Sequence, residues 1–458
     1  MRPRFALPAI ALLCLLAYAP TLSVPLFEDD YGNLLQAQVY GPAAGLPQLM
    51  QDAVFRLRAT SYWVMWLLWQ AFHLAPRGYH LASLILHIAN AWLVYALAAW
   101  WRSTRPAAFW AGAFFAVAEG HQEAVIWLSA INELLLFFFG AASLLCWIRA
   151  ERARRPWLPR LGSVVLFALA LLSKESAVIL LPLFLLASAA PRWRPVGSAA
   201  LRLAPHIALA GLAIASVLAS RGSSFRFSDG SFSLGAPFWI TWPRGVARLL
   251  WVWGWLSLAA LAALRLPRER QSPDWRKPAC LALAWMGLAL IPYSFLTYST
   301  QIPSRQTYLA SAGLAFLVGL ALARLSWWGG RPWTRFLPGT SLPQQPTRAS
   351  AADHGVRPTF SGGARLAAAT AVIVILVNAG YLWTRKRAQF LERAAPTEQL
   401  IALARRTTGP IWVHCFPRNS YIAQTAVELG AGRPPSILVW SEAEAALVHA
   451  TEFCYRER

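Results

Sequence analysis

About eleven apolar stretches alternate with polar connections along the chain, and most of them are close to 20 residues long. A helix of that length crosses the hydrocarbon of a bilayer, whereas the strands of a membrane barrel are shorter and alternate apolar with polar residues. Because lipid offers no partner to backbone polar groups, the stretches are predicted to be helices. The predicted spans are residues 5–26, 80–101, 107–118, 128–148, 161–172, 176–190, 201–220, 245–264, 279–297, 308–325 and 364–383.

Composition and charge agree with a membrane protein. Of 458 residues, 57% are hydrophobic and only 14% are charged, so one aqueous core could not hide the apolar surface. The net charge of +22 is carried mostly by alternate connections, as the positive-inside rule predicts for cytoplasmic loops. The first long connection, residues 27–79, is therefore expected outside. No basic face gathers on a soluble domain, which argues against a nucleic-acid partner.

The chain divides into four predicted parts. Residues 1–325 form a multi-span membrane core, whose first span is expected to stay uncleaved because Pro20 follows the one small-residue processing site. Residues 326–363, rich in Pro, Gly and Ser, are predicted to be a flexible cytoplasmic linker. The last helix covers residues 364–384, and residues 385–458 form a small tail domain. Basic residues at 385–387 conflict with an outer tail, so its side stays open.

The tail shows the pattern of a small α/β domain. Its periodicity predicts helices near 393–406 and 420–429, strands at 411–415 and 437–440, and a short helix after Ser441. Cys415 and Cys454 would pair if the tail faces an oxidising compartment, and unpaired buried thiols are equally consistent with the sequence.

Three consecutive carboxylates, Glu28, Asp29 and Asp30, follow the first span at the outer surface. Adjacent carboxylates raise one another's pKa, so one of them can act as a base or the group can bind a cation. The alternative is a solvated loop start.

A second outer connection carries His121, Glu123 and Glu133. Ionisable residues at the end of a short membrane helix are costly unless they face water or a partner, which indicates a polar cavity. His121 and Glu123 are close enough in sequence to be joint ligands of a divalent metal, for which an interfacial hydrogen-bonded loop is an equal alternative. No cofactor is certain.

Two further connections carry candidate phosphate ligands. Lys174 and Glu175 separate two short apolar runs, where they either pair with each other or leave Lys174 as a point charge for a phosphate. Arg305 and Tyr308 lie in the connection 301–308, where Arg305 either binds a phosphate or extends to the interface. All four candidate clusters map to the same predicted face of the membrane.

Five stretches resemble the GT-C fold glycosyltransferases, membrane enzymes that use a polyprenyl-phosphate sugar. They are residues 27–33, 78–90, 121–133, 173–175 and 305–313. The pattern is similar to the branch of protein O-mannosyltransferases that carry tetratricopeptide repeats, although the tail is too short to hold such an array. The resemblance implies an all-α polytopic fold with about eleven transmembrane helices.

The resemblance also implies the chemistry. Asp29 and Asp30 match the acidic pair at the reaction centre, and one of them would deprotonate the acceptor hydroxyl in an inverting, hexosyltransferase-like transfer. Lys174 and Arg305 would hold the donor phosphate. The remaining candidates for substrate binding are Glu28, His121, Glu123, Glu133, Glu175 and Tyr308.

The expected function is therefore a glycosyltransferase with a polyprenyl-phosphate sugar donor and a protein, lipid or glycan acceptor. Its expected place is a bacterial inner membrane, among membrane lipids. A transporter or flippase of a lipid-linked substrate is the main alternative, although no internal repeat supports it. A non-catalytic scaffold is the third, since the family pattern is altered at Ala118, Glu119, Ile131 and Asn132.

Overall fold

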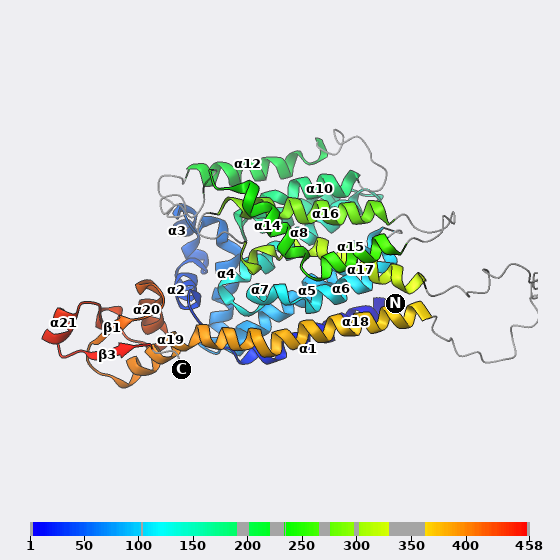
Figure 1. The fold of residues 1–458 in the computed structure, drawn as a ribbon. Helices are drawn as coiled ribbons and strands as arrows, with labels where there is room; N and C mark the ends of the chain where they lie inside the picture. The colour runs from blue at the N-terminus through cyan, green and yellow to red at the C-terminus, as the bar shows by residue number, and fades with distance from the viewer. Residues whose placement is uncertain are drawn as a thin grey trace, which may run out of the picture.

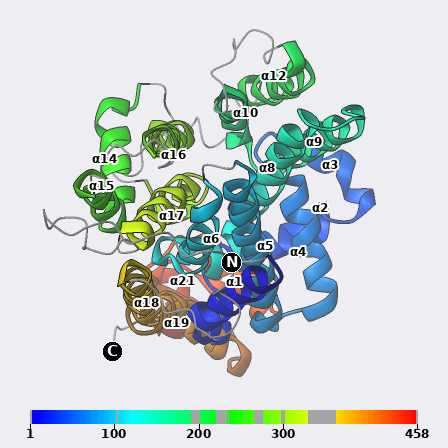
Figure 2. The same cartoon turned by 90° about the vertical axis from the view of Figure 1, so that its right-hand side faces the viewer.

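A computed structural model of the chain describes residues 3–101, 104–189, 201–219, 233, 235–264, 275–296, 302–328 and 362–455. Most helices of residues 3–328 run side by side in one bundle, and α18 (Gly362–Tyr381) lies along its flank beside α1 (Pro3–Tyr18) (Figures 1 and 2). The buried centre is formed by α5 (Pro76–Trp100), α6 (Ala108–Val117), α8 (Ile131–Ala150) and α17 (Ser311–Trp328).

Within the described residues, five helical stretches are long and apolar enough to cross a membrane. They are Arg4–Ser23, Pro76–Trp100, Leu128–Ala150, Arg276–Phe295 and Gly362–Arg406. A sixth is the pair α14 (Phe238–Leu250) and α15 (Trp253–Ala263), bent by 71°, where the sequence predicts one span over 245–264. Four shorter apolar helices are α9 (Trp157–Leu171), the helix around α10 (Leu180–Ala189), α12 (Ala204–Ala219) and α17.

The first connection is a folded cap rather than an open loop. It contains the 3-10 turns η2 (Ala43–Gly45) and η3 (Arg56–Arg58) and three α-helices, α2 (Asp30–Tyr40), α3 (Leu46–Gln51) and α4 (Ala59–Phe72). Leu34 and Tyr62 from this cap share a buried cluster with Leu128 from the start of the α8 stretch. The apolar side chains of the cap therefore hold it against one end of the bundle.

The last helix does not end at residue 383 as predicted. From α18 it continues through a π-helical turn, η11 (Leu382–Lys386), into α19 (Arg387–Arg406). The Ala, Leu, Glu and Arg residues beyond the membrane are good helix formers, so the helix leaves the lipid without a break. The basic turn is anchored as well, because the Arg387 guanidinium donates to the Pro20 carbonyl over 3.1 Å. Residues 329–361, most of the predicted linker, lie outside the described residues, and α17 extends to Trp328.

The tail is a small α/β unit with three parallel strands in the order β2-β1-β3. The strands are β1 (Ile411–Cys415), β2 (Leu438–Val439) and β3 (Thr451–Cys454), and the connecting helices are α20 (Ser420–Thr425) and α21 (Glu442–Leu447). Strand β3 is missing from the sequence prediction because only Phe453 of its four residues is buried. The predicted fold class, a multi-span helical membrane protein with a small α/β appendage, is confirmed.

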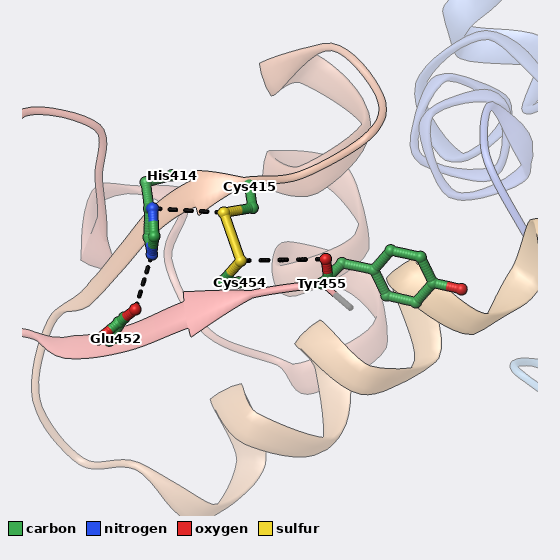
Figure 3. The surroundings of a disulfide bond; sticks show 5 residues. All are labelled: His414, Cys415, Glu452, Cys454 and Tyr455. Carbon is green, nitrogen blue, oxygen red and sulfur yellow. Dashed lines mark hydrogen bonds and ion pairs between the residues drawn. A yellow bond between two sulfur atoms is a disulfide. The ribbon is translucent and has the colours of Figure 1, made fainter. Parts of the chain in front are cut away.

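A disulfide joins Cys415 of β1 to Cys454 of β3, with 4.4 Å between their Cα atoms (Figure 3). His414 lies beside it, with Nδ1 3.3 Å from the Cys415 sulfur and Nε2 2.8 Å from Glu452. Disulfides persist in oxidising compartments, so the bond favours an extracytoplasmic tail.

Contacts place the tail on the same side as the first connection. The Tyr31 hydroxyl donates to Glu398 over 3.2 Å, and Gln36 donates to the Tyr421 hydroxyl over 3.3 Å. Gly32 makes room for the Tyr421 ring, because a Cβ there would lie 2.8 Å from it. The chain's N-terminus lies at the opposite end of the bundle (Figure 1). The side of the tail, which the sequence leaves open, is thus that of residues 27–79.

We expect the double substitution Cys415→Ser and Cys454→Ser to destabilise the tail by about 2–4 kcal/mol, because the unfolded segment regains the freedom that the cross-link removes. Limited proteolysis of the intact protein measures this as faster cleavage within residues 407–455. Cys280→Ser, which removes an exposed free thiol, is the control. Equal cleavage of both variants would contradict the structural role of the bond.

Candidate active site

The carboxylate of Asp30 fixes the start of α2. The side chain is fully buried, and its Oδ1 accepts hydrogen bonds from the Ser129 amide over 2.9 Å and the Ser129 hydroxyl over 2.6 Å. Its Oδ2 accepts from the Phe27 amide over 3.1 Å. Burial raises the pKa of Asp30 to about 7, although these hydrogen bonds oppose the shift. Asp30 is therefore a structural anchor as well as a candidate catalytic group.

Glu28 connects the first loop to the tail. Its carboxylate accepts two hydrogen bonds from Arg393 of α19, at 3.1 and 2.5 Å, and pairs with Arg418 at 2.9 Å. Glu28 also has a φ of 52°, a conformation that residues other than glycine seldom adopt. The two guanidinium groups thus hold this strained turn and neutralise the buried Glu28 carboxylate.

Asp29 differs from its two neighbours because its carboxylate accepts no hydrogen bond from the described residues. It is partly buried and precedes the first residue of α2. Burial and the Glu28 charge raise its pKa, while the positive charges of Arg305, Arg393 and Arg418 act in the opposite direction. Of the three carboxylates, Asp29 is the one available to a substrate.

Glu123 and Arg305 meet beside the acidic triplet. Glu123 lies on α7 (Gln122–Ile126), and its Oε2 accepts from the Ser304 hydroxyl over 2.8 Å and the Arg305 amide over 3.1 Å. The Arg305 guanidinium lies 3.8 Å from Glu123, and that of Arg393 lies 3.6 Å from it. Burial alone would raise the pKa of Glu123, but the arginines and these hydrogen bonds outweigh it, and the pKa is lowered. Arg393 therefore links Glu28 to Glu123.

Two guanidinium groups lie against the indole of Trp127. The Cζ of Arg305 is 4.8 Å from its ring centroid, and that of Arg393 is 4.9 Å. Such stacking aligns planar cations against an aromatic face. Trp127 is 7% exposed, and its Nε1 has no acceptor among the described residues. A buried donor without an acceptor is costly, so this N–H is available to a water molecule or a ligand oxygen.

Glu133 and Lys174 form an adjoining cluster. They are joined by a buried ion pair, and the Tyr293 hydroxyl donates to the other oxygen of Glu133 over 2.9 Å. Glu175 pairs with Arg58 at 3.0 Å, so Lys174 and Glu175 do not pair with each other. Both residues of the short turn bind partners that lie far away in sequence.

The two clusters are close along the chain. Ser129, which binds Asp30, lies in the 3-10 turn η6 (Leu128–Ala130), and Glu133 lies four residues later in the first turn of α8. The Thr60 hydroxyl from the cap also lies 2.7 Å from the Ser173 hydroxyl, next to Lys174. The structure thus links Glu28 to Glu123 through Arg393, and it places Asp29 where it feels the charge of Arg305. Glu133 and Lys174 form a separate pair that is connected to the cap through the neighbouring Ser173.

His121 and Tyr308 lie in the buried core instead. His121 is 1% exposed, with Nε2 2.6 Å from the Ser311 hydroxyl, and the Tyr308 hydroxyl lies 2.7 Å from Nδ1 of His87. His121 and Glu123 therefore bind different partners and do not converge on one point. Glu28 and Glu123 are paired with arginines, so a metal ion bound by these carboxylates would have to displace the guanidinium groups. Within the described residues, the single triple of metal-ligating types comprises His414 and the two disulfide-bonded cysteines.

Sequence reasoning missed Arg393, Arg418 and Ser129. The charge pattern does not separate Arg393 from the other arginines of α19. The one signal that could have found it is Phe390, an apolar residue three positions earlier that faces the same side of the helix and is buried in the structure. In the structure the Arg393 guanidinium lies 5.3 Å from the Phe390 ring and 5.1 Å from that of Phe27.

Two kinds of comparison relate the chain to known proteins. Its sequence matches no protein-family model. One stretch of 111 residues is 33% identical to the protein O-mannosyl-transferase Tmtc1 of Drosophila melanogaster, which covers 23% of this chain and 12% of that protein. The chain therefore matches about an eighth of the length of this relative.

Solved structures match over nearly the whole chain. ArnT from Cupriavidus metallidurans, crystallised with undecaprenyl phosphate, has a TM-score of 0.52 at 13% identity, covering 99% of this chain and 90% of ArnT. An oligosaccharyltransferase of Archaeoglobus fulgidus, tethered to an acceptor peptide, has a TM-score of 0.51 at 12% identity, covering 95% of this chain and 64% of its own.

These likenesses define the class of fold. The chain is an integral membrane protein with the GT-C fold, and the resemblance inferred from its motifs is confirmed at the level of fold. Its sequence is in part similar to that of a protein O-mannosyl-transferase.

We expect Arg393→Gln to loosen the tail from the cap, because Glu28 and Glu123 both lose a positive partner in a largely buried place. Amide hydrogen exchange should rise about tenfold in residues 420–425. The control is Arg406→Gln, an exposed arginine on the same helix. Unchanged exchange in Arg393→Gln would show that the ion pairs do not hold the tail.

Proposed function

We propose that the chain is a membrane glycosyltransferase that moves a sugar from a polyprenyl-phosphate carrier to an acceptor hydroxyl at the outer face of the membrane. The observation that carries the proposal is the free Asp29 carboxylate beside two arginines stacked on Trp127. A base and phosphate-binding cations are the two requirements of this reaction.

Asp29 is the better base of the predicted pair. Asp30 is fully buried and accepts three hydrogen bonds, so its oxygens are already used. Asp29 is partly exposed and keeps both oxygens for an acceptor. Its raised pKa makes the carboxylate a stronger base than an ordinary aspartate, while the positive charges of the nearby arginines oppose the shift. Asp30 then acts as a positioning residue.

Arg305 and Arg393 are the proposed ligands of the donor phosphate. Both guanidinium groups lie within 4.9 Å of the centroid of one indole ring, and their side chains keep about a quarter of their surface exposed. Planar guanidinium groups bind phosphate oxygens in pairs. The Trp127 Nε1 supplies a third donor. Lys174, the candidate from the sequence, is engaged by Glu133 and acts in this proposal by positioning the start of α8.

The proposed step is a single displacement. Asp29 accepts the proton of the acceptor hydroxyl. At the same time the hydroxyl oxygen of the acceptor forms a bond to the anomeric carbon of the sugar. The bond from that carbon to the phosphate oxygen breaks, and the electron pair leaves with the polyprenyl phosphate. The arginines stabilise the added negative charge, which is largest in the transition state. Attack from the face opposite the leaving group inverts the anomeric carbon.

The structural relatives support this choice of donor and acceptor class. ArnT was crystallised with undecaprenyl phosphate bound, and the archaeal oligosaccharyltransferase was crystallised with a tethered acceptor peptide. For this chain we propose a polyprenyl-phosphate hexose as donor and a protein, lipid or glycan hydroxyl as acceptor. The proposed location is a bacterial inner membrane, with the disulfide-bonded tail on the outer side.

We expect Asp29→Asn to lower transfer by at least about a hundredfold, because the acceptor loses its base. The assay incubates membranes with a radiolabelled polyprenyl-phosphate sugar and follows label on the acceptor. Asp30→Asn should also lower transfer, but together with thermal stability, since the Phe27 amide loses its acceptor. Glu392→Gln, at an exposed position, is the control.

The pH dependence of the transfer rate distinguishes whether Asp29 acts as a base or has only a structural role. Because the pKa of Asp29 is raised, transfer should decline with falling pH at a higher pH than an ordinary aspartate would impose. Arg418→Gln removes a charge that lowers this pKa, so the decline should move to still higher pH. Full activity of Asp29→Asn would remove the proposed base, and carrier movement without sugar cleavage would identify a flippase instead.

We expect Trp127→Phe to lower transfer by about tenfold. An aromatic ring remains against the arginines, but the N–H that would donate a hydrogen bond to the phosphate of the sugar substrate is lost. The same assay measures it, with Trp440→Phe in the tail as the control. An unchanged rate would show that the indole N–H does not contact the substrate.

A further inference from the structure

A cavity of about 510 Å³ lies apart from the carboxylate cluster. It is open to the surroundings and is lined by the 3-10 turn η1 (Ala19–Ser23) after α1, the start of α5, and the turn η11 with the first residue of α19. Its polar lining consists of Ser23, Arg77 and Arg387, and Trp383 closes one wall. No residue of the candidate active site lines it, so it is a separate place on the molecule.

The cavity carries two positive charges and no carboxylate among its lining residues. The Arg387 guanidinium is held at the wall by the Pro20 carbonyl at 3.1 Å and the Ser23 hydroxyl at 3.3 Å. Arg77 is exposed and makes no hydrogen bond or ion pair with any residue that the structure describes. An uncompensated pair of guanidinium groups at one cavity favours an anion.

The position of the cavity relative to the membrane indicates which anion it would meet. Three candidate spans, Arg4–Ser23, Pro76–Trp100 and the α18 helix, end or begin at the cavity. A 20-residue helix such as Arg4–Ser23 is about 30 Å long, the thickness of the hydrocarbon layer. The cavity therefore lies where that layer meets the headgroups, the level of lipid phosphates.

Apolar surface continues from the cavity toward the membrane centre. Leu15 and Leu16 on α1 are 42% and 53% exposed, and α1 lies beside α18 (Figures 1 and 2). Trp383 donates its indole N–H to the carbonyls of Leu16 and Ala17, each over 3.1 Å, and leaves the ring 49% exposed. An anchored, exposed tryptophan of this kind is typical of the membrane interface.

We propose that this cavity binds the phosphate headgroup of a lipid in the outer leaflet. Arg77 and Arg387 bind the phosphate oxygens, and the lipid chains lie along the exposed leucines of α1. Such a ligand also accounts for the basic residues that break the charge rule at the end of α18, since a bound phosphate compensates Arg387 on the outer side. The site requires both parts of the ligand, the phosphate and the chains.

Native mass spectrometry of the whole detergent-solubilised chain tests the proposal with three probes. Phosphatidylglycerol carries phosphate and chains, diacylglycerol carries the chains alone, and inorganic phosphate carries the anion alone. We expect retention of phosphatidylglycerol only. Equal retention of diacylglycerol, or displacement of the lipid by equimolar inorganic phosphate, would overturn the proposal.

Substitutions locate the binding. Arg77→Gln should weaken phosphatidylglycerol binding about tenfold, as expected for a lost hydrogen bond between charged groups. Arg387→Gln should do the same, but it also removes contacts to η1. Arg77→Gln breaks no contact with the described residues, so it is the variant that tests whether the cavity binds the lipid phosphate. The control is Arg385→Gln, an exposed arginine of the same turn that does not line the cavity. Wild-type binding by Arg77→Gln would overturn the assignment.

Discussion

The fully buried carboxylate of Asp30 is the constraint on which the rest of the site depends. A carboxylate without exposed surface must be supplied with donors inside the protein, and Ser129 and Phe27 supply them. Because Ser129 opens the α8 stretch, these hydrogen bonds fix the start of α2 against the bundle. Asp29 and Glu28 then project from a turn that has no freedom to move.

The tail is part of the site rather than an appendage to it. Arg393 comes from a helix that crosses the membrane as α18 and continues outward without a break. Its guanidinium pairs with Glu28 and Glu123 and stacks on Trp127, so one side chain joins three separate pieces of the chain. This arrangement balances a dense group of carboxylates with arginines, as a site near low-dielectric lipid requires.

The candidate active site and the proposed lipid cavity lie on the same side of the helical bundle. Both are built from helix ends on one side of the bundle, and both depend on the continuous helix from α18 to α19. In the active site the arginines face carboxylates, whereas in the cavity the lining offers them none. The arginines proposed to bind the donor phosphate therefore share their charge with carboxylates, whereas the two arginines of the cavity do not.

By itself, the sequence determined the membrane character of the chain, most of its apolar helices and the set of candidate residues that lie at helix ends. These follow from apolar length, alternating charge and the placement of Glu28, Asp29, Asp30, Glu123 and Arg305 at helix ends, all of which are local along the chain. The GT-C fold also followed, through the order of its motifs.

Only the tertiary structure decided which of these residues touch. Lys174 pairs with Glu133 rather than Glu175, His121 turns into the core, and Arg393 and Arg418 enter the site from the tail. Local patterns indicate which face of a helix is polar, but the partner of a buried charge is set by packing between segments hundreds of residues apart. The break between α14 and α15 is decided in the same way, because helix propensity is a weak guide where neighbouring helices supply or withhold support.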